Sequence, residues 1–237
     1  MRAHVFIAVL VATPLAQAQV TITDANHRLS VFAEADLDPD HSDSFVGSAL
    51  GHFADQRSIE AGYPSVLSRA TAMEDSTILA DTSIFEGVLS ADAEGWTYEW
   101  DRGMGTAVTS LTASFTVVTE IEIVFDYAIE TTRQGALVTN YAEVGLLSMS
   151  TYNYLYIADH GYGANGFATS QAVTLAPGDY LLNFTAEAFA GTLSEPGIAA
   201  YAAETTLTYD VAFVPAPPSL AAPFAFCLLT ACRRRHG

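Results

Sequence analysis

Acidic side chains crowd into one short segment of the chain, and their chemistry suits a divalent cation. Residues 36–43 read Asp-Leu-Asp-Pro-Asp-His-Ser-Asp, and carboxylate oxygens are the ligands that Ca²⁺ prefers. An EF-hand loop starting here would need glycine at its sixth position and glutamate at its twelfth. Those positions hold His41 and Gly47, so the EF-hand motif is absent. The segment predicts either a calcium site of another kind or a solvated acidic loop, with candidate ligands Asp36, Asp38, Asp40 and Asp43.

Aromatic residues recur at every second position in two other segments. One row is Trp96, Tyr98 and Trp100, and the other is Tyr152, Tyr154 and Tyr156. Rings on one face of a strand, with carboxylates such as Glu99 and Asp101 beside them, can stack against sugar rings. The same spacing is typical of a strand that faces a core. The two rows are therefore candidate glycan-binding residues or core residues.

Catalytic motifs give no comparable signal. The chain has no G-x-S-x-G elbow, no H-E-x-x-H helix and no P-loop. The histidines of the central region, at positions 27, 41, 52 and 160, are scattered without the spacing of metal ligands. A serine triad assembles in space rather than in sequence, so that alternative stays open. We predict no catalytic residue, a protein that is not an enzyme, and no cofactor other than the calcium considered above.

The elements that would position these residues are β-strands, because apolar and polar residues alternate along most of the chain. Residues 111–117 and 121–129 both show this period of two, which is typical of strands with one face in a core and one in water. A turn near Thr119 or one long bent strand would both fit. Later runs, 180–184 and 207–213, repeat the pattern. The expected inward side chains include Phe115, Ile121, Ile123, Phe125, Tyr209 and Phe213.

The order of these strands indicates the fold class. About ten short strands with turn signals and no βαβ rhythm predict an all-β, antiparallel two-sheet sandwich, and a jelly roll is the preferred topology. Residues 45–53 fit either an amphipathic helix or a strand, and we favour a strand. The sandwich is expected to occupy residues 19–214 as one domain.

Charge limits the partners of this domain. The chain carries a formal net charge of −18 and contains no lysine; residues 19–214 hold five arginines and all 27 acidic residues, which gives −22. Such a domain repels nucleic acid and anionic membranes, and divalent cations, neutral glycans or basic proteins suit it better. Both cysteines, Cys227 and Cys232, lie near the C-terminus, so the domain has no disulfide.

The N-terminus has the three parts of a secretory signal peptide. Arg2 is followed by an apolar run over 5–11, and Pro14 precedes Leu15-Ala-Gln-Ala18. Ala16 and Ala18 form an A-x-A cleavage site. We predict that residues 1–18 are removed on export by the Sec machinery.

The C-terminus also carries a targeting pattern. Val214-Pro-Ala-Pro217 is followed by an apolar run over 219–232 and then by Arg233, Arg234 and Arg235. A permanent membrane helix needs about 20 apolar residues, so this run is short and suits transient membrane engagement. The arginines would stay on the cytoplasmic side.

Together the proline-rich hinge (Val214, Pro215, Ala216, Pro217), the short apolar run and the three arginines resemble the PEP-CTERM sorting signal of Gram-negative bacteria. The usual motif has glutamate where this chain has Ala216. The resemblance covers residues 214–237 and implies a sorting route: processing by a membrane-embedded exosortase, and an association with exopolysaccharide and biofilm matrix. It transfers no catalytic residue. We assign residues 215–237 to this sorting tail.

Two classes of function remain. The preferred one is an exported, non-enzymatic protein sorted to the cell envelope, the cell surface or the extracellular matrix, with a structural or exopolysaccharide-associated role. The alternative is a carbohydrate-binding β-sandwich module, and a carbohydrate-active enzyme comes third.

Overall fold

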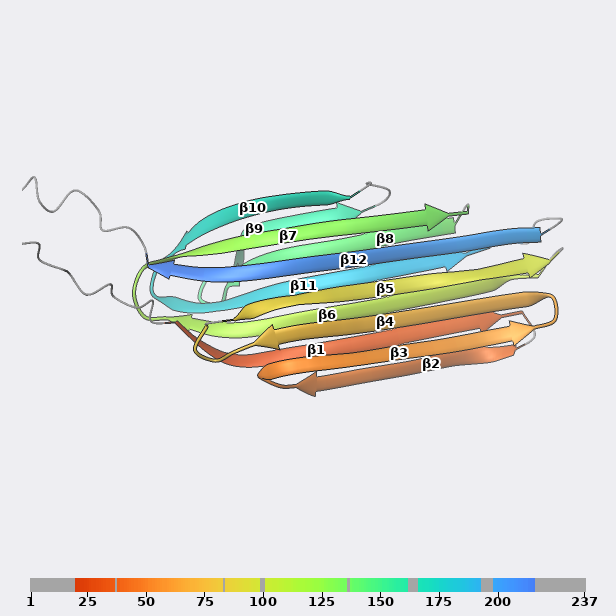
Figure 1. The fold of residues 1–237 in the computed structure, drawn as a ribbon, viewed down its shortest axis with the longest axis horizontal. Coiled ribbons are helices and arrows are strands. Elements are labelled where there is room, and N and C mark those ends of the chain that lie inside the picture. The colour runs from red at the N-terminus through yellow and green to blue at the C-terminus, as the bar shows by residue number, and fades with distance from the viewer. Residues whose placement is uncertain are drawn as a thin grey trace, which may run out of the picture.

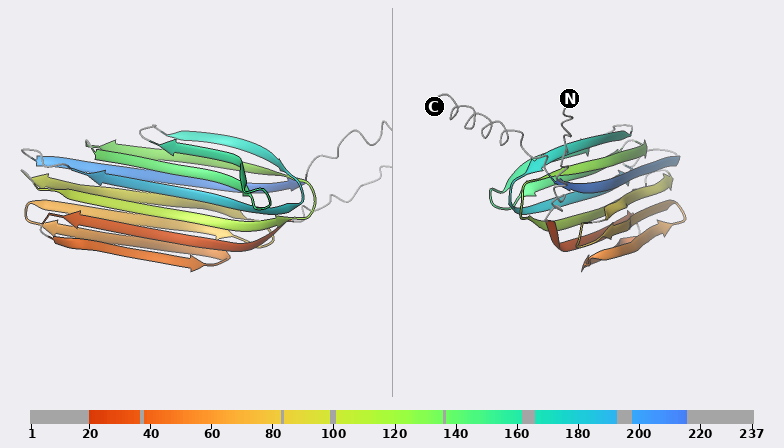
Figure 2. Two further views of the ribbon diagram at one scale, coloured as in Figure 1. Left: turned by 180° about the vertical axis from the view of Figure 1, so that it is seen from behind. Right: turned by 60° about the vertical axis from the view of Figure 1, so that its left-hand side comes forward.

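The computed structural model describes residues 20–36, 38–82, 84–98, 101–135, 137–161, 166–192 and 198–215. Twelve strands form two six-stranded antiparallel sheets that pack face to face (Figures 1 and 2). In spatial order, sheet I contains β2 (Asp38–Ser48), β1 (Val20–Ala35), β6 (Gly103–Val117), β11 (Gly178–Gly191), β8 (Leu137–Ser148) and β9 (Asn153–Gly161). Sheet II contains β10 (Phe167–Leu175), β7 (Ile121–Gln134), β12 (Ile198–Pro215), β5 (Phe85–Tyr98), β4 (Val66–Ile78) and β3 (Gly51–Tyr63). Within these described ranges no helix is long and apolar enough to cross a membrane.

The last eight strands form a jelly roll, as the sequence predicted. Their antiparallel pairs are nested from the outside inwards: β5 with β12, β6 with β11, β7 with β10 and β8 with β9. Members of successive pairs lie in opposite sheets, which is how a rolled ribbon of paired strands becomes a sandwich. The first four strands widen it: β1 and β2 extend sheet I beyond β6, and β4 and β3 extend sheet II beyond β5.

Alternation of side chains places the core between the sheets. Along β6 every second residue is buried, and the same holds for most of β4, β7 and β11. The predicted inward residues are confirmed: five are buried, and Phe213 packs against the core from a partly buried position. A turn near Thr119 separates β6 from β7, so the two alternating runs lie in different sheets. Residues 45–53 span the end of β2, a two-residue connection and the start of β3, which confirms strands over a helix.

The size of the buried side chains changes along the length of the sandwich. Near the end where β12 finishes, large aromatic side chains fill the space; Phe184 of sheet I stacks on Tyr209 of sheet II with ring centroids 4.2 Å apart. Towards the other end alanine and glycine predominate and leave room for the large buried ring of Tyr201. A Cβ at Gly105 would lie 2.7 Å from the backbone oxygen of Arg69 in the opposite sheet, so small residues allow the sheets to approach closely there.

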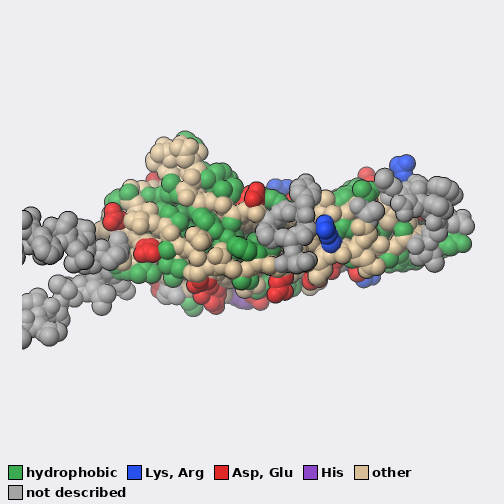
Figure 3. Space-filling model, turned by 90° about the horizontal axis from the view of Figure 1, so that it is seen from above, with side chains coloured by type: hydrophobic (Ala, Val, Ile, Leu, Met, Phe, Trp, Pro, Cys, Tyr) green, Lys and Arg blue, Asp and Glu red, His purple; other side chains and the backbone are tan. Residues whose placement is uncertain are grey.

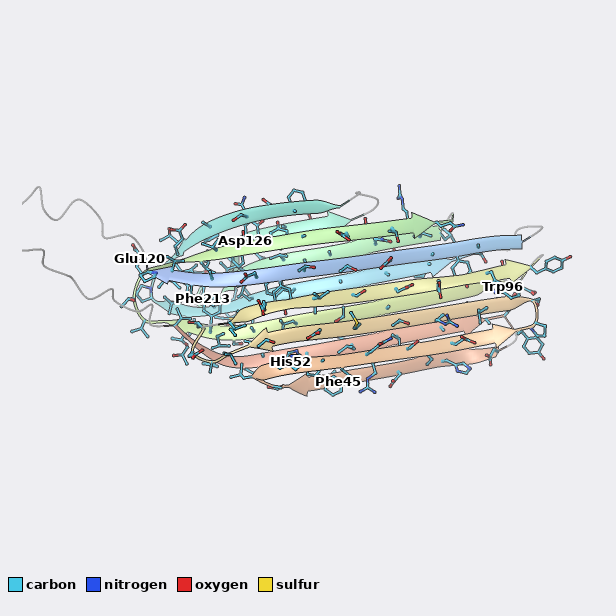
Figure 4. All side chains as sticks on the ribbon, viewed as in Figure 1. Phe45, His52, Trp96, Glu120, Asp126 and Phe213 are labelled. Atoms are coloured by element: carbon cyan, nitrogen blue, oxygen red, sulfur yellow. The ribbon has the colours of Figure 1, made fainter. Side chains whose placement is uncertain are left out.

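Both ends of the described chain lie at the same end of the sandwich. β1 starts and β12 finishes on the left in Figure 1. We call this the proximal end and the opposite one the distal end. The distal end carries Trp96, and Phe213 lies near the proximal end (Figure 4).

Candidate functional site

A buried ionisable pair connects the two sheets, and sequence analysis did not identify it. His27 of β1 and Glu74 of β4 both point inwards, and His27 Nδ1 lies 2.6 Å from Glu74 Oε1. The second ring nitrogen, Nε2, lies 3.0 Å from the backbone oxygen of Ala49. Ser76 donates its hydroxyl to the same Glu74 oxygen at 2.8 Å, and the imidazole stacks on Phe53 with centroids 4.1 Å apart.

The contacts of His27 favour its protonated form. A carbonyl oxygen can only accept, so Nε2 carries a proton, and Nδ1 faces a carboxylate. Burial lowers the pKa of His27, but the hydrogen bonds to Glu74 and Ala49, with the Glu74 charge, outweigh burial, and the net pKa is raised. Glu74 Oε2 is buried without a hydrogen-bond partner.

This pair is a structural connection rather than a catalytic centre. The His27 and Glu74 side chains are 1% and 0% exposed, so no substrate reaches them. In a serine triad the nucleophile would bond to the imidazole, whereas Ser76 bonds to the carboxylate. A sequence signal for the pair exists: both residues occupy the inward register of an alternating strand, where apolar residues are expected.

The first two acidic candidates for calcium bind backbone groups. Asp36 accepts the backbone N–H of Arg102 at 2.8 Å. Asp38 begins β2, accepts the N–H of Gly62 at 2.9 Å, and lies 3.2 Å from His41 Nε2. These bonds tie the β1–β2 turn to the start of β6 and to β3, and they hold the two carboxylates on different partners.

The other two candidates lie further along β2. Asp43 accepts a long bond, 3.5 Å, from Arg57 of β3, and Asp40 is exposed. Among the residues that the structure describes, no three His, Cys, Asp or Glu side chains are grouped closely enough to hold a metal ion. Calcium binding at this segment stays a prediction, which thermal melts in calcium and in chelator would test.

The tryptophan row lies at the distal end of sheet II. Trp96 and Tyr98 both point outwards from β5, with 37% and 46% of their surfaces exposed, and Thr97 between them is buried. Tyr98 also donates its backbone N–H to Ser65 at 2.8 Å. Trp100 lies outside the described residues.

The tyrosine row is divided by an irregularity in β9. The register with β8 shifts between Tyr154 and Tyr156, so Leu155 is an extra residue. Tyr154 therefore points outwards, whereas Tyr156 turns inwards and stacks on Phe125 with centroids 5.5 Å apart. Tyr152 is in the preceding turn with a φ of 54° and is 76% exposed. The three rings do not form one platform.

A shallow groove of about 240 Å³ lies beside Trp96 on the outer face of sheet II. Leu67 of β4 and Ala200 of β12 are the cross-strand neighbours of Trp96, so the indole is flanked by apolar side chains. The next row supplies polar groups: Arg69 donates to Glu94 at 3.1 Å and to Glu60 at 2.6 Å. An aromatic face beside fixed polar groups is the arrangement that sugar rings require.

A larger groove of about 770 Å³ crosses five strands of the same face, from β4 to β10. Its floor is formed by small residues, and Glu86, Asp210 and Asp126 lie directly opposite one another in one cross-strand row. This row was not predictable from the sequence, because strand register cannot be read from single strands. Like charges in such positions repel.

The same repulsion acts nearer the distal end, where Glu204 lies opposite Asp92. Burial, followed by the charges of Glu94 and Glu204, raises the pKa of the half-buried Asp92 to about 6. Most of the charged side chains on the outer face of sheet II are thus carboxylates.

Residues 161–166 also have G-x-G-x-x-G spacing. A dinucleotide fingerprint joins a strand to a helix within a βαβ unit. Here the segment joins β9 to β10 of an antiparallel sandwich, so the fingerprint's required context is absent.

The predicted processing residues fall mostly outside the described chain. Ala16, Ala18, Ala216, Pro217 and the three arginines 233–235 lie there. Val214 and Pro215 end β12, where they pair with Glu122 and Ile121 of β7.

Comparisons with known proteins identify no family. No protein-family model and no curated protein matches the chain. The enzymatically active domain of bacteriophage CBA120 tailspike protein 4 is similar with a TM-score of 0.20 and 8% identity, over 67% of this chain and 19% of that chain. A structure of infectious bursal disease virus, Gx strain, gives a TM-score of 0.17 and 9% identity, over 90% of this chain and 74% of that chain. At these TM-scores neither similarity supports a functional argument.

Proposed function

We propose that the chain is an exported, non-enzymatic protein sorted to the cell envelope or extracellular matrix, with the β-sandwich as its folded body. The observation that carries this proposal is the pairing of an N-terminal signal pattern with a C-terminal hinge, apolar run and arginines. The positions of the described ends support it, because a body attached through residues after Pro215 would direct its distal end away from the attachment.

Cell fractionation tests the sorting step. Deletion of residues 216–237 leaves β12 complete, since this strand ends at Pro215. The full chain should be recovered with envelope or matrix, and the truncated chain should appear in the periplasm or medium. A variant with Arg233, Arg234 and Arg235 changed to Gln tests the basic end separately. Equal distribution of the full and truncated chains would show that the tail has no sorting role.

The second candidate is a carbohydrate-binding module, and the groove beside Trp96 favours it. The indole is flanked by Leu67 and Ala200, with the Arg69–Glu94 pair in the next row. On a body attached at its proximal end, this groove would face outwards and would be accessible to an extracellular polysaccharide. The domain's excess of carboxylates favours neutral or amino sugars over acidic ones.

Affinity electrophoresis in gels containing neutral, basic or acidic polysaccharides tests this candidate. Trp96→Ala should abolish retardation, because the sugar ring can then no longer stack on the indole. The control is Tyr154→Ala, which removes an exposed aromatic side chain of sheet I and should leave retardation unchanged. No retardation of the parent chain by any polysaccharide, or equal retardation of both variants, would exclude this groove as the binding site.

A further inference from the structure

The two open sides of the sandwich differ in charge. One side is formed by β2 and β3, and we call it the β2–β3 rim; the other is formed by β9 and β10, the β9–β10 rim (Figures 1 and 2). The strands of the β2–β3 rim contain Pro39 and many charged residues: Asp38, Asp40, Asp43, Asp55, Arg57 and Glu60. Charges and proline on edge strands prevent pairing with other chains.

The β9–β10 rim lacks this protection. Neither β9 nor β10 contains proline, lysine or arginine, and Asp159 is their one carboxylate. Large apolar side chains are exposed instead: Tyr154 54%, Leu155 44%, Ile157 51% and Phe167 43%. Figure 3, which looks onto this side, shows hydrophobic side chains in patches among polar ones. An edge strand of this composition is a template for another strand.

Side-chain contacts between the two sheets fix the position of β9 relative to β10. The hydroxyls of Tyr127 in sheet II and Tyr156 in sheet I lie 2.6 Å apart. Phe125 stacks on Tyr156, and Phe167 contacts Tyr127 with centroids 6.0 Å apart. Beyond Leu155 the register of β9 with β8 is regular, and that of β10 with β7 is regular over all nine residues. The rim therefore presents two ordered edges, one from each sheet.

We propose that the β9–β10 rim binds the same rim of a second copy of this chain. A single bound peptide strand would pair with only one of the two edge strands, β9 or β10, and would leave the backbone groups of the other unpaired. A second sandwich, related by a two-fold axis perpendicular to the sheets, satisfies both: β9 pairs antiparallel with its copy, and β10 pairs with its copy. Such an interface is isologous. Charge favours this rim for self-association, because a chain of net charge −18 repels its copy least where carboxylates are few.

Sedimentation velocity of the full chain over a concentration series tests the proposal. The parent should form a dimer as its concentration rises. Changing Ile157→Lys and Phe167→Lys together should raise the dissociation constant at least about tenfold, because like charges then meet across the axis. The matched control is Val46→Lys on β2, a residue 73% exposed on the opposite rim, which should leave the dimer unchanged. Circular dichroism checks that each variant is folded.

A charge exchange separates the rim from association through the apolar tail. Ile157→Lys and Ile157→Asp should each be monomeric alone, and a mixture of the two should restore a dimer containing one copy of each. Association through the tail would be insensitive to both substitutions. A parent that stays monomeric at all concentrations, or a dimer that survives the Ile157 and Phe167 changes, overturns the proposal.

Discussion

At the scale of single residues, the His27–Glu74 pair is where this sequence departs most from an apolar core. Burying two charges costs free energy, which their attraction and hydrogen bonds must offset. Here three hydrogen bonds join the group, yet Glu74 Oε2 has no hydrogen-bond partner. The pair fixes β1 against β4 and holds the β2–β3 connection through the Ala49 carbonyl.

A double-mutant cycle measures what this pair contributes. His27→Phe alone leaves Glu74 buried without its partner and should lower the free energy of unfolding by about 3–5 kcal/mol. Adding Glu74→Leu removes the unpaired charge, so the double variant should recover most of that loss. Urea unfolding of all four proteins checks this. Additive losses in the double variant would mean that the two groups do not act as a pair.

Asp92 predicts a dependence of stability on pH. Its pKa is raised from 3.8 to about 6 in the folded protein, so between these values the folded state binds more protons than the unfolded state. The contribution of Asp92 to the free energy of unfolding is therefore fully present below pH 3.8 and is lost as the pH rises through 6. Asp92→Asn should raise the free energy of unfolding at pH 7 by about 1–2 kcal/mol and flatten the pH profile between pH 4 and 6. An unchanged profile in urea melts would contradict this.

At the scale of elements, period-two alternation was sufficient to predict strands over 111–117, 121–129, 180–184 and 207–213 and the inward faces of these strands, because burial repeats within each strand. The described residues form twelve strands, more than the ten or so short ones expected. Contacts between strands were not predictable in the same way. The extra residue Leu155 turns Tyr156 into the core, and nothing in the alternation of β9 marks it. The contact of His27 with Glu74 depends on how the two sheets pack against each other. The row containing Glu86, Asp210 and Asp126 depends on pairing register, and single strands encode neither.

The close approach of the sheets at Gly105 gives an element-scale prediction. Gly105→Ala would place a methyl group 2.7 Å from the Arg69 carbonyl oxygen, and a backbone atom cannot move aside alone. We expect a loss of about 1–3 kcal/mol in the free energy of unfolding. Gly178→Ala, whose nearest contact would be 3.7 Å away, is the control and should change stability much less. Equal effects in thermal melts would mean that the sheets separate easily.

At the scale of the whole molecule, the fold places the chain ends, the Trp96 groove and the β9–β10 rim on different parts of the sandwich. Both described ends lie at the proximal end, the Trp96 groove lies at the distal end, and the β9–β10 rim lies along one side. Attachment through the tail would leave the groove and the rim accessible at the same time. The jelly roll thus suits a surface protein that is fixed at one end, and the sorting tail is the feature on which that account depends.

The most direct test of that account is the mass of the protein recovered from its own cells, measured separately in each cell fraction. Export predicts that the chain is found with envelope or matrix and that its N-terminus is Gln19, because cleavage follows Ala18. A shortened C-terminus in that fraction would additionally show processing within the tail. A protein intact from Met1 to Gly237 and recovered in the soluble cytoplasm would contradict the account.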